Sequence, residues 1–84
     1  MPDQQAPADV VVIVTGQPVL VPIGSADTVL DVRRVAVATL GYDEGAYWEV
    51  RDRIGELVDQ TRQAVEVCGT TDRLFVNLPP GVGA

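Results

Sequence analysis

The 84-residue chain offers few side chains for covalent or acid–base chemistry. It has no histidine and no lysine, so its six basic residues are all arginines, and its one cysteine is Cys68. Without histidine there is no imidazole base to activate a nucleophile and no histidine-rich metal site. Cys68 lies between Val67 and Gly69 with no basic neighbour. We therefore interpret it as a buried or unreactive thiol.

Two other groups of residues could be mistaken for sites. Asp43 and Glu44 are adjacent carboxylates in a polar stretch, and because no third ligand accompanies them we interpret them as a solvated loop. The run Gly81-Val82-Gly83 is no phosphate loop, because no helix follows to offer its N-terminal amides. We expect a protein that is not an enzyme and that holds no cofactor or metal.

Composition and charge exclude several kinds of partner. Twelve acidic residues against six arginines give a net charge of −6, which repels a phosphate backbone, so we expect no nucleic-acid binding. The longest apolar run, Val10 to Val14, is far shorter than the roughly 20 residues that span a bilayer. The first residues lack the basic and apolar stretches of a signal peptide. The sequence favours one small cytoplasmic domain that does not bind a membrane.

The first third of the chain predicts a leader and a hairpin. Residues 1–8 contain no periodic apolar pattern, so we expect them to be disordered. Residues 10–14 are all β-branched, and residues 19–23 place Val19, Val21 and Ile23 on one face. Residues 15–18 have the composition of a tight turn, which joins the two predicted strands in a hairpin.

A helix is predicted next. Apolar residues at 29, 32, 36 and 40 form its buried stripe, and Arg33 and Arg34 lie off that stripe. Thr28 and Asp31 have the spacing of a capping box, with Asp27 as the competing N-cap. Gly41 is the expected stop.

The second half of the chain predicts three further strands. Residues 47–51 alternate, with Trp48 inward and Tyr47 on the opposite side. Residues 56–58 form a short strand, and residues 59–69 have room for one helical turn. Residues 73–78 alternate again, with Leu74, Val76 and Leu78 inward and Phe75 outward. Phe75 and Tyr47 are therefore candidates for an exposed docking face.

This order of elements predicts the fold class. One amphipathic helix is buried economically against one face of a mixed sheet, and the first and last strands can pair in parallel because a helix lies between them. We expect an α+β domain over residues 9–78 with the β-grasp arrangement, followed by an extended, flexible tail over residues 79–84.

Several segments carry a resemblance to a known family. They are the turn glycine Gly16, Ser25-Ala26-Asp27-Thr28-Val29 at the helix start, Trp48-Glu49-Val50-Arg51-Asp52, Asp59, Arg73-Leu74-Phe75-Val76-Asn77-Leu78, and the ending Gly81-Val82-Gly83-Ala84. With these segments, residues 9–83 resemble ubiquitin and its relatives, among them the bacterial ubiquitin-like modifiers of the multiubiquitin kind.

The resemblance implies a protein tag. In that family an adenylating E1-like enzyme activates the C-terminal carboxylate, an E2-like enzyme carries it on a cysteine, and it is then joined to target proteins. The implied conjugation residue is Gly83, and the partners would read the residues before it, which are Leu78, Pro79, Pro80, Gly81 and Val82. Glycine suits a tail that threads a narrow channel, because it has no Cβ. The prolines stiffen the exit from the last strand.

The chain departs from the family pattern after Gly83. Counted from Leu78, Gly83 completes a tail of the length that ubiquitin has, so Ala84 is one residue more. We expect a JAB-type metalloprotease to cleave between Gly83 and Ala84, with direct use of Ala84 as the alternative. Two other functions share the fold: a sulfur carrier whose carboxylate becomes a thiocarboxylate, and an adaptor that is never conjugated.

Overall fold

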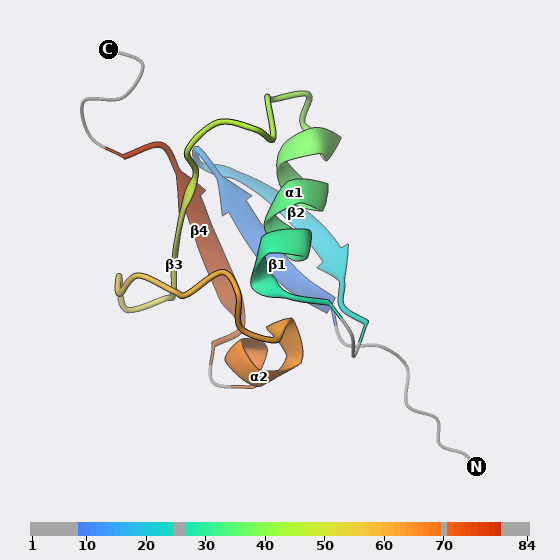
Figure 1. The fold of residues 1–84 in the computed structure, drawn as a ribbon, viewed down its shortest axis with the longest axis vertical. Coiled ribbons are helices and arrows are strands. Elements are labelled where there is room, and N and C mark those ends of the chain that lie inside the picture. The colour runs from blue at the N-terminus through green and yellow to red at the C-terminus, as the bar shows by residue number, and fades with distance from the viewer. Residues whose placement is uncertain (1–8, 25–26, 70, 80–84) are drawn as a thin grey trace.

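A computed structural model of the chain describes residues 9–24, 27–69 and 71–79. Four strands form one mixed sheet, and one long helix lies across one face of it (Figure 1). The elements in chain order are β1 Asp9–Val14, β2 Gln17–Pro22, α1 Val29–Thr39, β3 Glu49–Arg51, α2 Ala64–Cys68 and β4 Arg73–Asn77. The expected α+β class, with a mixed sheet and one main helix, is confirmed.

The first and last strands form the centre of the sheet. The strand order is β2-β1-β4-β3, and β1 runs parallel to β4, with Val12 opposite Leu74 and Val14 opposite Val76. The two outer pairs, β1–β2 and β3–β4, are antiparallel. The predicted parallel pairing of the chain's two ends is therefore confirmed.

The N-terminal hairpin turns more tightly than expected. Thr15 and Gly16 both have positive φ, at 47° and 89°. That combination marks a two-residue turn whose twist matches that of the strands. Gln17 and Pro18 already belong to β2, where they face Val14 and Ile13. The turn is thus shorter than the predicted range of residues 15–18.

Both ends of α1 carry the predicted caps. The Thr28 hydroxyl accepts from the Asp31 amide at 3.3 Å, and the Asp31 carboxylate accepts from the Thr28 amide at 3.2 Å. Asp27, the competing cap, instead accepts from the Gly24 amide. At the other end Gly41 has φ 84°, and its amide donates to a carbonyl of the last turn. Glycine adopts this left-handed conformation without strain, so the helix stops there.

The buried face of α1 is broader than predicted. It consists of Val29, Val32, Arg33, Ala36 and Val37. These residues recur at i, i+3, i+4, i+7 and i+8, which makes a wide apolar face. The predicted stripe was narrower and continued to Leu40, which is the C-cap and is only partly buried. The prediction that Arg33 lies off the stripe is wrong, because its side chain is 8% exposed. Burial lowers the pKa of its guanidinium, with smaller influences from Arg34 and Glu44.

The strand predicted at residues 56–58 is not formed. Only one bridge links this segment to the sheet, between Arg51 and Leu57. The Asp52 carboxylate accepts from the amides of Ile54 at 3.1 Å and Glu56 at 3.0 Å, and Gly55 has φ 91°. These contacts close a tight turn after Asp52. Because the Asp52 side chain binds the Glu56 amide, that amide is not available to a β-ladder.

The core lies between α1 and the inner face of the sheet. Its members are Val10, Val12, Val14, Val21, Ile23, Val29, Val32, Ala36, Val37, Trp48, Val50, Ala64, Val67, Leu74 and Val76. Most are valines, which have low helix propensity and suit strands. The helix among them is therefore held by packing and by its caps.

Prolines close the free edge of β2. The two-residue turn makes Val14–Gln17 a hydrogen-bonded pair, so the backbone groups of Pro18, Leu20 and Pro22 point away from β1. Proline has no N–H, so Leu20 supplies the single outward amide of this strand.

The other edge is covered by the chain itself. The Val58 amide donates to the Val50 carbonyl at 2.8 Å, and the Gln60 side chain donates to the Trp48 carbonyl at 2.9 Å. Neither edge therefore offers a row of free donors and acceptors to a second strand.

We expect the double substitution Pro18→Val with Pro22→Val to cause self-association, because it adds two outward amides to β2. Sedimentation velocity at increasing concentration should show the monomer giving way to larger species. Gln17→Val is the control, since it adds an apolar residue whose amide faces β1. A double variant that sediments like the wild type would show that the prolines do not protect this edge.

Candidate functional site

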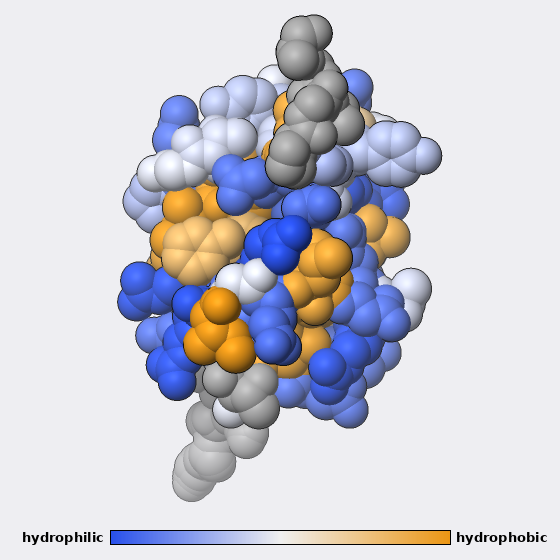
Figure 2. All heavy atoms as spheres, turned by 90° about the vertical axis from the view of Figure 1, so that its left-hand side faces the viewer, coloured by the Kyte–Doolittle hydropathy of each residue, from blue (hydrophilic) through white to orange (hydrophobic). Residues whose placement is uncertain are grey.

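Phe75 lies on the outer face of the sheet, the face opposite α1. Its neighbours Leu74 and Val76 point inward and are fully buried, as the alternation predicted. In the sheet Phe75 lies between Ile13 of β1 and Arg51 of β3. Its side chain is half-buried, because those neighbours flank it. Figure 2 shows apolar surface interrupted by charged groups on the side of the molecule that carries β3 and β4.

Tyr47 is the most exposed of the large apolar and aromatic residues described, at 82%. Tyr47 lies at the end of the loop between α1 and β3. The next residue, Trp48, holds this loop in place. The Trp48 indole N–H donates to the Asp43 carbonyl at 2.7 Å, and its ring centroid lies 5.8 Å from that of Tyr42. The strand predicted over residues 47–51 is formed only over Glu49–Arg51, but Trp48 is buried as predicted and Tyr47 is exposed.

The same loop contains the adjacent acidic residues Asp43 and Glu44, and both bind groups within it or on α1. The Asp43 carboxylate accepts from the Gly45 amide at 2.9 Å. The Glu44 carboxylate pairs with Arg34 at 2.9 Å, and its backbone carbonyl accepts from Arg33 at 3.0 Å. Both acids therefore position the loop, which agrees with their interpretation as loop residues.

The two candidate docking residues occupy different places along the β3–β4 ladder. Phe75 faces Arg51, whereas Tyr47 precedes Glu49, which faces Asn77. Tyr47 is therefore nearer the end of the ladder at which the chain leaves β4. No contact between the two rings is among the described interactions.

The tail begins directly after β4. Leu78 was expected to point inward, but it is 37% exposed, because the ladder ends at Asn77 and no strand covers the next residue. Pro79 is half-buried. The remaining predicted tail residues, Pro80, Gly81, Val82, Gly83 and Ala84, lie outside the described residues.

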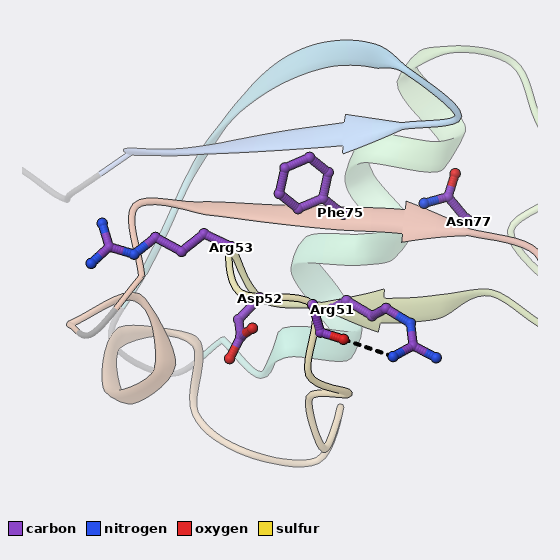
Figure 3. A pocket seen from close by; sticks show the side chains of 6 residues that line it. Arg51, Asp52, Arg53, Phe75 and Asn77 are labelled. Atoms are coloured by element: carbon purple, nitrogen blue, oxygen red, sulfur yellow. Dashed lines mark hydrogen bonds between the residues drawn. The ribbon is translucent and has the colours of Figure 1, made fainter.

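An open pocket of about 260 Å³ lies beside Phe75 (Figure 3). It is lined by Arg51, Asp52, Arg53, Gly55, Phe75 and Asn77. The sequence had indicated only Phe75 among these. Alternation places Arg51 on the outer face, but the register of β3 against β4 decides that it faces Phe75. The arginines could have been found only by predicting that register.

Cys68 is not part of this pocket. It is the last residue of α2 and is half-buried. Burial raises the pKa of its thiol above the ordinary value, because the thiolate is less well solvated there. The reactive thiolate is thus disfavoured, which supports the interpretation of Cys68 as unreactive.

No protein-family model matches the chain, and no curated protein matches it. Among the described residues no group of three or more Cys, Asp or Glu is placed to hold a metal ion. No helix in residues 9–24, 27–69 and 71–79 is long and apolar enough to cross a membrane.

We expect Phe75→Ser to leave the domain folded, because part of the ring's surface is already in contact with solvent. The loss of partial burial should cost about 1 kcal/mol of unfolding free energy. Val76→Ser is the matched control: it changes the adjacent, fully buried residue and should cost about 3 kcal/mol. Urea denaturation followed by Trp48 fluorescence measures both. Equal losses for the two variants would contradict the assignment of Phe75 to the outer face.

Proposed function

We propose that this chain is a ubiquitin-like protein modifier with the β-grasp fold. Cleavage before Ala84 would expose the carboxylate of Gly83, and the Gly83 acyl group would then be joined to target proteins. One observation carries the proposal: the central strand β4 leads straight into the glycine-containing tail, with no further element described between Asn77 and Pro79.

The topology supports the fold assignment. A hairpin, a helix across one sheet face, a parallel pair of first and last strands and a short edge strand occur in the order that a β-grasp requires. Such a fold serves many functions, so the tail and its chemistry carry the functional argument.

The start of the tail supports a role in recognition. Leu78 is exposed, and the proline that follows has a fixed φ and cannot donate to a ladder. Chain extension along β4 is therefore stopped, and a partner can contact Leu78 directly. Beyond it, Gly81 and Gly83 lack a Cβ that would obstruct passage through a narrow active-site channel.

The proposed chemistry needs no catalytic group from this chain. A carboxylate oxygen of Gly83 attacks the α-phosphorus of ATP and displaces pyrophosphate. The cysteine thiolate of the E1-like enzyme then attacks the carbonyl carbon and releases AMP, leaving a thioester. After transfer to the E2-like cysteine, a target nucleophile displaces the thiolate. The chain contributes the acyl group, and the ATP site, the thiols and the base belong to its partners.

Docking of these partners would use Phe75 and Tyr47. Both present aromatic surface on or beside the outer face of the sheet, where large amphipathic side chains commonly carry binding energy. In this proposal Phe75→Ser weakens thioester transfer while the fold persists.

We expect cleavage after Gly83 to be required for conjugation. The chain should be co-expressed with an E1-like, an E2-like and a JAB-type protein, and the products weighed by intact-mass spectrometry. A variant ending at Gly83 should form the thioester without the protease. A variant ending at Val82 should form little, because its tail is one residue shorter and its terminal residue is β-branched.

The same experiment separates the alternatives. Replacement of a carboxylate oxygen by sulfur would identify a sulfur carrier. Complete absence of thioester with every partner would indicate an adaptor. Conjugation through Ala84, with no loss of mass, would contradict the assignment of Gly83.

We also expect single modification, or at most linear chains through the amine of residue 1, and no branch on an internal side chain. The chain has no lysine, and an arginine guanidinium stays protonated and is a poor nucleophile. Tryptic mapping of conjugates formed in cells tests this. A variant with Arg34→Lys is the positive control, because Arg34 is exposed on α1. An internal branch point in the wild-type chain would show that another side chain accepts the acyl group.

A further inference from the structure

The pocket beside Phe75 contains a guanidinium group to which the described residues offer no hydrogen bond or ion pair. The guanidinium groups of five of the six arginines bind described residues. Arg33 and Arg34 bind Glu44, Arg51 binds Glu49 and Gly55, Arg62 binds Glu66, and Arg73 binds Asp72. Arg53 is the exception among the described residues. Its guanidinium makes no hydrogen bond or ion pair with them, although its side chain lines the pocket. It lies near the Asp72 carboxylate, whose pKa is lowered mainly by the bond to Arg73 and to a smaller extent by the charge of Arg53.

Arg51 adds a second, partly occupied cation. It donates to the Gly55 carbonyl at 2.7 Å and to the Glu49 carboxylate at 3.3 Å. A guanidinium has five N–H donors, so several stay available to a ligand. In Figure 3 the Arg51 and Arg53 side chains extend in opposite directions, with Phe75 and Asn77 on the neighbouring strand. The pocket thus has a cation towards each end and an aromatic ring beside them.

The turn that carries these arginines is held in place. The Asp52 carboxylate accepts from two amides of the turn, and the Asp52 amide donates to the Glu56 carbonyl at 2.9 Å. The Arg53 amide donates to the Thr71 hydroxyl at 3.3 Å, and that hydroxyl donates to the Arg73 carbonyl at 3.0 Å. A ligand would therefore meet a preorganised backbone, and the Arg53 side chain is what binding would still have to order.

Charge and edge geometry limit what could occupy the pocket. The pocket lining holds two guanidinium groups against one carboxylate, that of Asp52, which already accepts from two amides of the turn. Although Glu49 pairs with Arg51 from outside the lining, the lining itself has a positive balance on a chain whose net charge is −6. A nucleic acid is long enough to be repelled by acidic residues over most of the surface. A short acidic segment is affected only by the charges near the pocket, because charges are screened beyond about 8 Å. Since both sheet edges are closed, a bound segment has to be recognised by side chains.

We propose that this pocket binds an acidic segment of a partner protein. An apolar side chain of the segment contacts Phe75, and carboxylates on either side of it accept hydrogen bonds from Arg51 and Arg53. The inference rests on the proposed function, because it states what the partners that use the Phe75 docking face must present. Arginine suits this task, since its planar fork matches a carboxylate.

The test is a titration of ¹⁵N-labelled protein with capped synthetic peptides, observed by NMR. The first peptide is Glu-Glu-Leu-Glu-Glu, the second replaces each glutamate with glutamine, and the third replaces leucine with serine. We expect the first to shift the amides of residues 51–55, 75 and 77 with a Kd of about 1 mM. The other two should bind about tenfold more weakly, because each lacks one kind of contact.

Arginine variants connect this binding to the pocket. Arg53→Gln should weaken binding of the first peptide about tenfold and leave the spectrum away from Asp72 unchanged, because the guanidinium makes no described hydrogen bond or ion pair that would be lost. Arg51→Gln should do the same, although it also removes the bond to Gly55. Arg62→Gln is the control, with an equal charge change on an exposed arginine away from the pocket. Equal affinity of all three variants would overturn the proposal.

Two further results are decisive. A single-stranded oligonucleotide that shifts the same amides more strongly than the acidic peptide would replace the proposal with a nucleic-acid site. If the E1-like enzyme forms no thioester with the wild-type chain while peptide binding follows the expected pattern, the proposed function fails and the acidic-segment site stands. If thioester forms but the acidic peptide binds no better than its glutamine counterpart, the acidic-segment site fails alone.

Discussion

The parallel pairing of β1 with β4 joins the beginning of the described chain to its end, and the other elements are arranged around it. A parallel pair cannot be made by a hairpin, so the chain has to cross over one face of the sheet before β4 can lie beside β1. The crossing contains α1, whose buried residues contact β1 and β2. Val12, Val14, Leu74 and Val76 are almost completely buried in this pair. Loss of apolar packing here would therefore release both the helix and the edge strands.

The position of α1 in turn determines the loop that presents Tyr47. The helix buries Arg33, and that side chain reaches the Glu44 carbonyl, while Arg34 holds the Glu44 carboxylate. The arrangement has a cost, because the Nε of Arg33 is buried without a partner among the described residues. It leaves Trp48 inside with its indole N–H bonded and Tyr47 outside. An exposed aromatic residue is thus held by a chain of contacts that begins on the helix.

The outer face of the sheet combines features that suit reversible recognition. Prolines close one edge and residues 56–60 cover the other, so the sheet is protected from pairing with a second sheet. Between the edges, β3 and β4 bring Arg51, Arg53 and Phe75 to one pocket. Charged groups beside a half-buried ring limit non-specific contacts while leaving a specific one possible. The chain leaves β4, the strand that carries Phe75, through the exposed Leu78.

Local patterns in the sequence determined much of this architecture. Strict alternation assigned Leu74, Val76 and Trp48 to the interior and Phe75 to the outer face, because side chains of a strand alternate whatever the strand pairs with. The capping box and Gly41 marked the ends of the helix, because caps depend on neighbouring residues. The parallel pairing was also predictable, since the order of elements leaves few other ways to bury one helix.

Tertiary structure alone decided the remaining features. Arg33 is buried because the loop after α1 supplies a carbonyl for it, and helical periodicity in itself carries no information about that loop. Leu78 is exposed because the β3–β4 ladder ends one residue earlier, although its alternation continues. Residues 56–58 form no strand beyond the single bridge at Leu57, because the Asp52 carboxylate takes the Glu56 amide into the preceding turn. The pocket required the register of two strands, which depends on how side chains distant in sequence pack together, and no local pattern of residues specifies that.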